Sequence, residues 1–209
     1  MPILHIYRLN ALKSINIAIF ASGNGTNAQR IIEYFSDKNA VNIKLVVSNV
    51  ESANVLHRAN KLNVSSEILS KQQTKSGNAI HDLMLKYDID FIVLAGYLKL
   101  IPSELIQLFN GPIINIHPAL LPNYGGKGMY GMNVHEAVIE AGEKCSGISI
   151  HHVTENYDEG DIILQEKTEI STEDTPSILA QKIHQLEYTY FPLVIEKIAT
   201  SILHQSTSK

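Results

Sequence analysis

Short apolar runs alternate with helix-like segments along the first half of the chain, and this alternation constrains the fold more than any other feature. The runs are continuously apolar, as in INIAIF at 15–20 and FIVLA at 91–95. Such runs are typical of strands buried on both faces of a sheet. Strands that alternate with helices predict β-α-β units and a parallel sheet. The predicted strands are 15–20, 43–47, a weaker 64–69, 91–95 and 113–116, and the predicted helices are 26–35, 52–62, 77–87 and 102–109.

The second half of the chain has a different pattern. A loop rich in glycine and proline occupies 118–131, and GISIHHV at 147–153 alternates as a half-exposed strand does. Pro192 interrupts the last helical segment, so we expect a kink or two helices rather than one straight rod. The further predicted elements are a helix at 133–141, strands at 147–153 and 162–170, and a helix from about 175 to 202.

These elements predict one doubly wound α/β domain, with a mostly parallel sheet, helices on both faces and a mixed C-terminal part. We assign residues 15–209 to this domain and residues 1–14 to an N-terminal arm. Side chains that favour helix N-caps precede two of the helices. These are Ser52 for helix 52–62, and Ser171, Thr172 or Asp174 for the last helix.

Composition excludes several classes of protein. The 17 basic residues are scattered and the net charge is −4, so we expect no nucleic-acid partner. Cys145 is the single cysteine, which excludes an internal disulfide framework and a multi-cysteine zinc site. The apolar runs are too short to span a membrane, and residues 1–14 lack the pattern of a signal peptide. We therefore expect a cytoplasmic protein without a membrane partner.

The first candidate site is the segment Ser22-Gly-Asn-Gly-Thr-Asn27, between the first strand and the first helix. Its glycines allow a sharp turn, and the free N–H groups at the start of a helix favour a phosphate. The alternative interpretation is a simple tight turn. Gly23-x-Gly25-x-x-Ala28 also matches the dinucleotide-binding fingerprint loosely.

Asn115 and His117 form the second candidate site, at the carboxyl end of the last buried strand, where open α/β sheets bind ligands. Their spacing places both side chains on one face. Taken alone, a single histidine at the end of a strand more often has a structural role than a catalytic one. Asp158, in the acidic loop 156–161, is its natural carboxylate partner, although that loop alone resembles a solvated turn.

Pairing with Asp158 would raise the pKa of His117 and hold it protonated. A protonated histidine and an amide suit a developing oxyanion. No serine or cysteine lies in a nucleophile motif, which favours direct transfer to a bound acceptor. His151 and His152 point to opposite faces of a strand, so even with Glu155 nearby we expect no metal.

Five segments resemble a known family in their order and spacing, over residues 15–203. They resemble the folate-dependent phosphoribosylglycinamide formyltransferases of purine synthesis. The Asn-x-His and Asp set is shared with other 10-formyltetrahydrofolate enzymes, and the glycine loop and the length narrow the resemblance to this branch. The five segments are Ser22-Gly-Asn-Gly-Thr-Asn27, Leu94-Ala-Gly-Tyr97, Asn115-Ile-His-Pro118, Leu120-Leu-Pro122 and Tyr157-Asp-Glu-Gly160.

The resemblance implies a formyltransferase fold, with 10-formyltetrahydrofolate and glycinamide ribonucleotide as small-molecule substrates. The protein would be a monomer or a homodimer. The catalytic residues would be Asn115, His117 and Asp158. The ribonucleotide would be held by Gly25, Thr26, Asn27, His184 and Glu187. The folate would be held by Leu98, Lys99, Leu100, Ile101, Asn115, Thr154, Glu155, Asn156, Tyr157 and Asp158. Lys99, His152 and His184 replace residues that are common in the family.

Three other functions fit less of the sequence. Formyl-methionyl-tRNA synthesis implies a longer chain with an RNA-binding module, and formyltetrahydrofolate hydrolysis implies an N-terminal regulatory domain. A dinucleotide-dependent enzyme or nucleotide-binding module would rest on the glycine loop alone. It would leave Asn115, His117 and Asp158 without a role.

Overall fold

A computed structural model of the protein describes residues 14–207. The expected arm at 1–14 therefore lies outside the described residues, apart from Ser14. The elements are β1 (Ile15–Phe20), α2 (Thr26–Phe35), β2 (Val41–Ser48), α3 (Asn54–Lys61), β3 (Ser65–Ile68), the 3-10 turn η1 (Gln73–Lys75), α4 (Gly77–Lys86), β4 (Phe91–Leu94), α5 (Ser103–Leu108), β5 (Ile113–His117), α6 (Met132–Glu140), β6 (Cys145–His152), β7 (Ile162–Glu169) and α7 (Pro176–Thr207).

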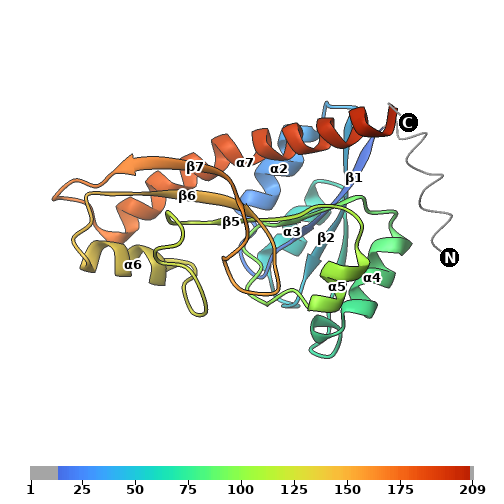
Figure 1. Cartoon of the computed structure of the whole chain (residues 1–209), viewed down its shortest axis with the longest axis horizontal. Helices are drawn as coiled ribbons and strands as arrows, with labels where there is room; N and C mark the ends of the chain where they lie inside the picture. The colour runs from blue at the N-terminus through green and yellow to red at the C-terminus, as the bar shows by residue number, and fades with distance from the viewer. Residues whose placement is uncertain (1–13, 208–209) are drawn as a thin grey trace.

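The strands form one seven-stranded sheet in the order β3-β2-β1-β4-β5-β6-β7 (Figure 1). Strands β1 to β5 pair in parallel, whereas β6 and β7 pair antiparallel to their neighbours. After β3 the chain crosses to β4 on the other side of β1. Open α/β sheets bind their ligands at such a reversal of strand order, at the carboxyl ends of the strands. The predicted mostly parallel sheet with a mixed C-terminal part is confirmed.

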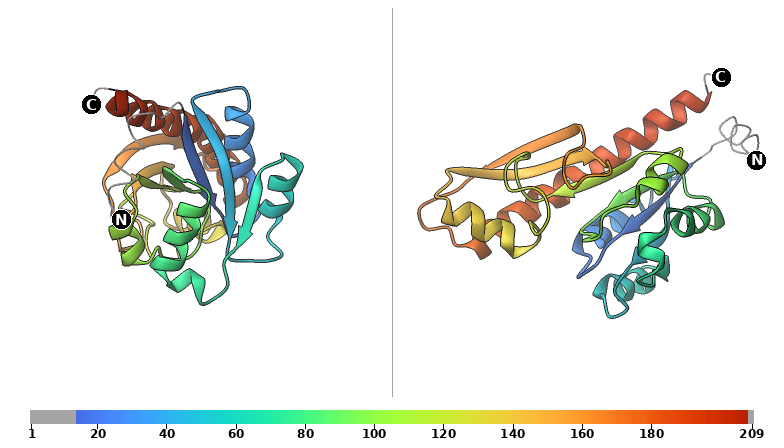
Figure 2. Two further views of the ribbon diagram at one scale, coloured as in Figure 1. Left: turned by 90° about the vertical axis from the view of Figure 1, so that its right-hand side faces the viewer. Right: turned by 60° about the horizontal axis from the view of Figure 1, so that its bottom comes forward.

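Two apolar clusters cover the two faces of the sheet. Alternate residues of β1 divide between them, because Ile17 and Ile19 belong to one cluster and Ala18 and Phe20 to the other. The first cluster includes side chains of α2, α3, α6 and α7, and the second those of α4 and α5. Figure 2 shows the helices on the two faces of the sheet from two directions. The doubly wound arrangement is thus confirmed.

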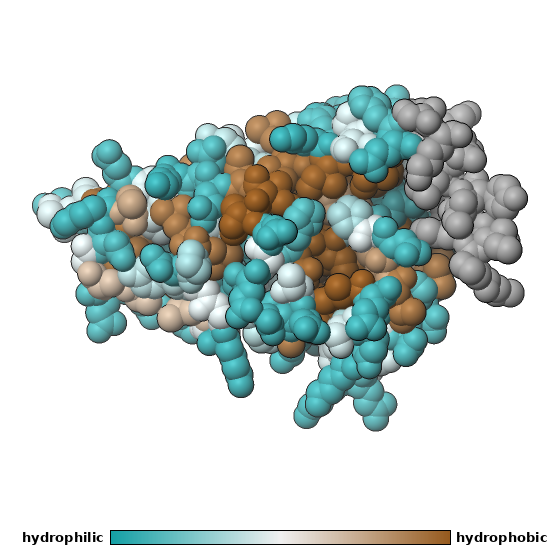
Figure 3. Space-filling view, viewed as in Figure 1, coloured by the Kyte–Doolittle hydropathy of each residue, from teal (hydrophilic) through white to brown (hydrophobic). Residues whose placement is uncertain are grey.

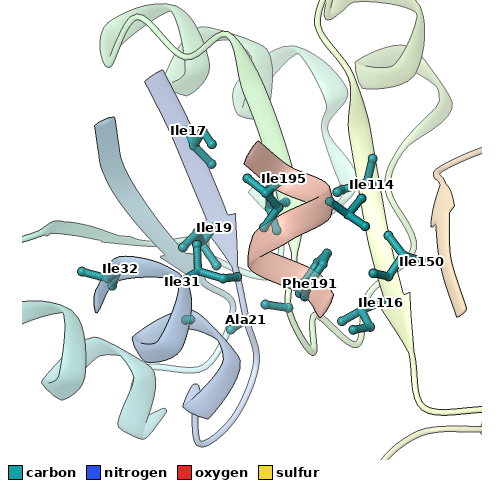
Figure 4. Packing of buried hydrophobic residues seen from close by; sticks show 14 of the residues in the cluster. Ile17, Ile19, Ala21, Ile31, Ile32, Ile114, Ile116, Ile150, Phe191 and Ile195 are labelled. Atoms are coloured by element: carbon teal, nitrogen blue, oxygen red, sulfur yellow. The ribbon is translucent and has the colours of Figure 1, made fainter. Parts of the chain in front are cut away.

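Helix α7 packs along β6 and β7 and then reaches α2 and β1. Phe191 and Ile195 are fully buried, and Figure 4 shows them between the isoleucines of β1 and α2 and those of β5 and β6. On the face seen in Figure 3, hydrophobic residues gather between α7 and α5, inside a hydrophilic rim. Within residues 14–207, no helix is long and apolar enough to cross a bilayer.

One helix runs through Pro192, so of the two expected alternatives, a kink or two helices, the second is wrong. Proline removes one N–H donor and leaves the carbonyl of Tyr188 without its helical partner. The Arg30 side chain of α2 donates to that carbonyl from Nε over 3.4 Å. The buried residues on either side of Pro192 hold the helix in place as well.

The other boundaries agree with prediction within two residues, except that α7 continues to Thr207 rather than ending near 202. Two predicted caps are wrong. Helix α3 begins after Ala53 rather than Ser52, and its Val55 N–H donates to the Gly23 carbonyl over 3.1 Å. Thr175 caps α7, since its Oγ1 accepts from the Ile178 N–H over 3.3 Å.

Candidate active site

The carboxyl ends of the central strands open into a cavity of about 650 Å³. Small-molecule sites commonly measure about 300–1,000 Å³. Every predicted site residue except Glu155 lines this cavity: Gly25, Thr26, Asn27, Leu98, Lys99, Leu100, Ile101, Asn115, His117, Thr154, Asn156, Tyr157, Asp158, His184 and Glu187. The three separate candidate segments of the sequence therefore meet in one place.

A glycine loop leads from β1 into α2 at the cavity. Gly25 has a φ of 75°, and a Cβ at this position would lie 2.4 Å from the Val55 Cβ. Both facts require glycine. Within residues 14–207 no side chain caps α2, so its first N–H groups are available to a ligand. Such groups, together with the helix dipole, favour an anion.

Hydrogen bonds from two directions fix the glycine loop. Ser22 Oγ donates to the Asn49 side chain over 2.6 Å and accepts from the Leu98 N–H over 2.9 Å. Arg58 of α3 donates from Nε to the Asn24 carbonyl over 2.8 Å, and from Nη2 to the Asn24 side-chain oxygen over 3.0 Å. The loop is therefore held in shape by the protein itself.

Glu187 of α7 lies beside the start of α2 and is 5% exposed. Its Oε2 accepts from Asn27 Nδ2 over 2.8 Å and from His184 Nδ1 over 2.9 Å. The hydrogen bond with Glu187 raises the pKa of His184, against the effect of burial. Among the described residues, Oε1 of Glu187 has no hydrogen-bond partner, which leaves it available to accept from a ligand.

Strand β5 carries Asn115 and His117 to the cavity on one face, as their spacing predicts. Asn115 Nδ2 donates to His151 Nε2 over 3.1 Å and to Asp158 Oδ1 over 3.4 Å. Because an amide N–H only donates, His151 Nε2 is the acceptor. The ring proton of His151 then lies on Nδ1, which donates to the His152 carbonyl over 2.8 Å.

Asp158 joins the two histidines. Its Oδ2 lies 3.5 Å from His117 Nδ1, and its Oδ1 lies 3.5 Å from His151 Nε2. The Gly126 N–H donates to Oδ2 over 2.8 Å. Burial raises the pKa of Asp158, but the Gly126 N–H that donates to its carboxylate acts in the opposite direction, and the pKa lies below its usual value. Its φ of 58° is left-handed, a conformation that aspartate tolerates better than most residues.

His117 is 3% exposed, and its Nε2 donates to the Tyr124 carbonyl over 2.7 Å. Burial lowers the pKa of His117, although Asp158 and this carbonyl act in the opposite direction. The expectation that Asp158 holds His117 protonated is therefore wrong. Loss of hydration outweighs a pairing at 3.5 Å. The neutral ring carries its proton on Nε2, and its Nδ1 faces the carboxylate as a proton acceptor.

Several polar side chains at the cavity were not predicted as site residues, among them His151, His135 and Tyr97. The alternation of β6 correctly separates His151, which is 2% exposed, from the exposed His152. The pairing of β6 with β5 sets His151 opposite Asn115. The register between β5 and β6 depends on how the two strands pair in the folded protein, and the sequence pattern of each strand does not predict it. His135 occupies the buried face of α6, where the helical spacing gave a signal for burial but not for a site.

The segments predicted to hold a folate lie together at the cavity, but one predicted residue, Glu155, does not line it. The Leu98 N–H is already bonded to Ser22, so this backbone donor is not free. Leu98 and Leu100 expose 43% and 41% of their surface, and Tyr157 exposes 37%. Apolar surface is therefore available to a flat ring.

The sequence profile of the formyl transferase family matches residues 15–195. The chloroplastic phosphoribosylglycinamide formyltransferase of Arabidopsis thaliana is 40% identical over 189 residues, which are 87% of this chain and 64% of that protein. The chain spans less than two thirds of the length of this plant relative and of a second one from Vigna unguiculata, at 60%. The phosphoribosylglycinamide formyltransferase of Bacillus subtilis is 34% identical, over 87% of this chain and 93% of that protein.

Solved structures give the same result. The phosphoribosylglycinamide formyltransferase of Anaplasma phagocytophilum superposes with a TM-score of 0.82 at 29% identity, over 90% of this chain and 88% of that one. The enzyme of the same name from Bacillus halodurans superposes with a TM-score of 0.78 at 34% identity, over 87% and 94%. The family match over residues 15–195 includes the whole sheet and every segment of the cavity.

Proposed function

The chain belongs to the formyl transferase family, and from this membership and its cavity we propose that it transfers a formyl group from 10-formyltetrahydrofolate to the amine of glycinamide ribonucleotide. This reaction belongs to purine biosynthesis. The folate is a co-substrate, and the proposed chemistry uses no metal. Among the described residues, no three histidine, cysteine or acidic side chains form a group that could hold a metal ion.

One observation carries the proposal: Asn115, His117 and Asp158 meet within 3.4–3.5 Å in the cavity that also receives the start of α2. The helix start provides a subsite for an anion. The three side chains provide an amide donor, a neutral imidazole and a carboxylate. Transfer of an acyl group to an amine needs a donor for the carbonyl oxygen and a route for a proton.

The chemistry follows from these protonation states. The amine attacks the formyl carbon, which forms a C–N bond and places negative charge on the formyl oxygen. Asn115 donates to that oxygen with the N–H that gives up its long contact, 3.4 Å, with Asp158. Nδ1 of His117 accepts the proton lost by the attacking nitrogen, and this proton then lies beside the Asp158 carboxylate. Its delivery to the leaving folate nitrogen accompanies cleavage of the original C–N bond.

The two substrates would occupy the two ends of the cavity. The phosphate binds at Gly25, Thr26 and Asn27, where the N–H groups of α2 are free. The ribose lies beside Glu187 and His184. The folate ring lies against residues 98–101 and 154–158, where apolar surface is exposed.

A spectrophotometric formyl-transfer assay with both substrates tests the function. The expected result is release of deformylated folate that depends on the ribonucleotide. Release without the ribonucleotide would instead identify a hydrolase. No release by a folded protein that binds a folate analogue would overturn the choice of amine acceptor.

The variant Asp158→Asn tests the proton route. We expect turnover to fall by about 10²-fold or more, within the range for the loss of a proton-transfer group. Asparagine tolerates the left-handed backbone at this position, so the melting temperature should change little. Asp161→Asn, an exposed residue outside the cavity, is the matched control and should keep normal turnover. Normal turnover of Asp158→Asn would remove the residue from the mechanism.

We also propose the cytoplasm as the place of action, since both substrates are water-soluble anions. A monomer or a homodimer remains our proposal for the oligomeric state. Cell fractionation and sedimentation of the whole chain test these two points.

A further inference from the structure

His135 is a buried histidine at the cavity that the proposed chemistry does not use. It lies in α6, is 3% exposed, and is one of the residues that line the cavity. Its Nδ1 is enclosed and has no hydrogen-bond partner among the described residues. Among these residues, Nδ1 therefore meets no group that could receive a proton, and this bears on which ring nitrogen carries the N–H.

The protonation state of His135 follows from its surroundings. Burial lowers its pKa, although the nearby Glu187 acts in the opposite direction. The ring is therefore neutral near pH 7 and carries a single N–H. Buried N–H groups without an acceptor are rarer than unpaired acceptors, so the enclosed Nδ1 is the unprotonated nitrogen. The proton lies on Nε2, which is not enclosed and makes no hydrogen bond within the described residues, so we infer that this edge of the ring faces the cavity.

The neighbours of this N–H indicate the class of ligand. His135 and Glu187 both line the cavity, and they belong to α6 and α7, which pack against one another. Oε1 of Glu187 lacks a partner among the described residues. The N–H of His135 and the Oε1 atom of Glu187 are therefore a donor and an acceptor that a ligand in the cavity can use. The carboxylate would repel a phosphate placed beside it, whereas a hydroxyl group is neutral and both donates and accepts.

We propose that His135 donates from Nε2 to a ribose hydroxyl oxygen of the ribonucleotide, while Glu187 Oε1 accepts from the sugar hydroxyls. His135 would thus be a specificity-determining residue for the sugar, and this role rests on the proposed function. The Nδ1 edge stays against the protein and fixes the tautomer that makes Nε2 the donor.

Calorimetric titration of the full chain with glycinamide ribonucleotide and its 2′-deoxy and 3′-deoxy analogues tests the proposal. We expect His135→Phe to weaken binding of the ribonucleotide by about 3- to 10-fold, as for the loss of one hydrogen bond. It should bind one of the two deoxy analogues as well as the wild type does, because that analogue lacks the bonded hydroxyl. Binding of a folate analogue should not change.

Further variants separate this role from a structural one. His135→Gln keeps an N–H donor and should recover most of the affinity, whereas His135→Leu should repeat the loss without an aromatic ring. Val138→Ala alters a buried position of the same helix outside the cavity. It should lower the melting temperature and leave the preference for the ribose hydroxyl intact.

Two results would overturn the inference alone: unchanged ribonucleotide affinity in His135→Phe, or an equal loss for the ribonucleotide and both deoxy analogues. If the wild type binds a folate analogue but no ribonucleotide, the proposed function fails, and the inference fails with it. If the wild type transfers the formyl group and His135→Phe binds the ribonucleotide with unchanged affinity, the inference about His135 fails and the proposed function is still supported.

Discussion

At the scale of single residues, the site is governed by a balance between burial and pairing. His117 and Asp158 both lose hydration, yet the pKa of His117 falls for that reason while the pKa of Asp158 falls in spite of it. Asp158 has the Gly126 N–H as a close donor at 2.8 Å, whereas its contact with His117 is 3.5 Å. The sequence predicted the partners correctly. The sign of the histidine shift depends on distances and burial that the sequence does not contain.

The lowered pKa of His117 has a consequence for stability against pH. The unfolded chain binds a proton near the usual pKa of 6.5, and the folded protein binds it only at lower pH. Between these values the unfolded state holds more protons, so stability falls as the pH falls. Asp158 contributes in the same direction only below its usual 3.8, whereas the raised pKa of His184 acts in the opposite direction.

We therefore expect His117→Gln to lose less stability than the wild type when the pH is lowered from 7 to 5. Denaturant titrations at several pH values measure this difference, and the NMR titration of the His117 ring gives its pKa directly. A ring that titrates above 6.5 in the free protein would contradict the expected direction.

At the scale of elements, hydrophobic periodicity together with glycine, proline and capping residues was sufficient to find every strand and α-helix of the described residues, but not the 3-10 turn η1. A strand such as β4 can be recognised from its continuous apolar sequence, because a strand that is buried on both faces has no polar position. Caps and the course of α7 were harder to predict. Arg30 donates to the carbonyl freed by Pro192, and Gly23 accepts from the first turn of α3. Both partners are distant in sequence, so local patterns cannot reveal them.

The glycine loop allows a matched test at this scale. Gly25→Ala introduces a Cβ 2.4 Å from that of Val55 at a φ of 75°, so we expect a loss of about 1–3 kcal/mol of stability and weaker ribonucleotide binding. Gly23→Ala is the control, because its Cβ meets nothing within 4 Å. Thermal unfolding and calorimetry measure the two effects. Equal stability of the two variants would show that the loop tolerates a side chain at Gly25.

At the scale of the whole molecule, α7 links the two parts of the sheet. Phe191 is fully buried between residues of the first strand and helix and those of β5 and β6 (Figure 4). Its position in the core followed from no single segment of the sequence, because its neighbours come from three distant parts of the chain. The same reason explains why Asn27 and Glu187, predicted separately, share a hydrogen bond.

Phe191→Ala should therefore lower the free energy of unfolding by about 3–5 kcal/mol, the usual range for a phenylalanine removed from a core. Leu193→Ala, in the same helix but 47% exposed, should change it by less than about 0.5 kcal/mol. Urea denaturation measures both values. Similar losses in the two variants would contradict the central place of Phe191 in the core.

The bond between Asn27 and Glu187 joins residues that are 160 positions apart. During synthesis on the ribosome, the glycine loop and α2 emerge long before α7 does. A nascent chain can form the parallel strands early, but the end of the cavity that His184 and Glu187 line stays incomplete until the final helix leaves the exit tunnel and docks. Ligand binding therefore reports on completed folding, and a ribonucleotide would stabilise the finished chain without acting on its earlier intermediates.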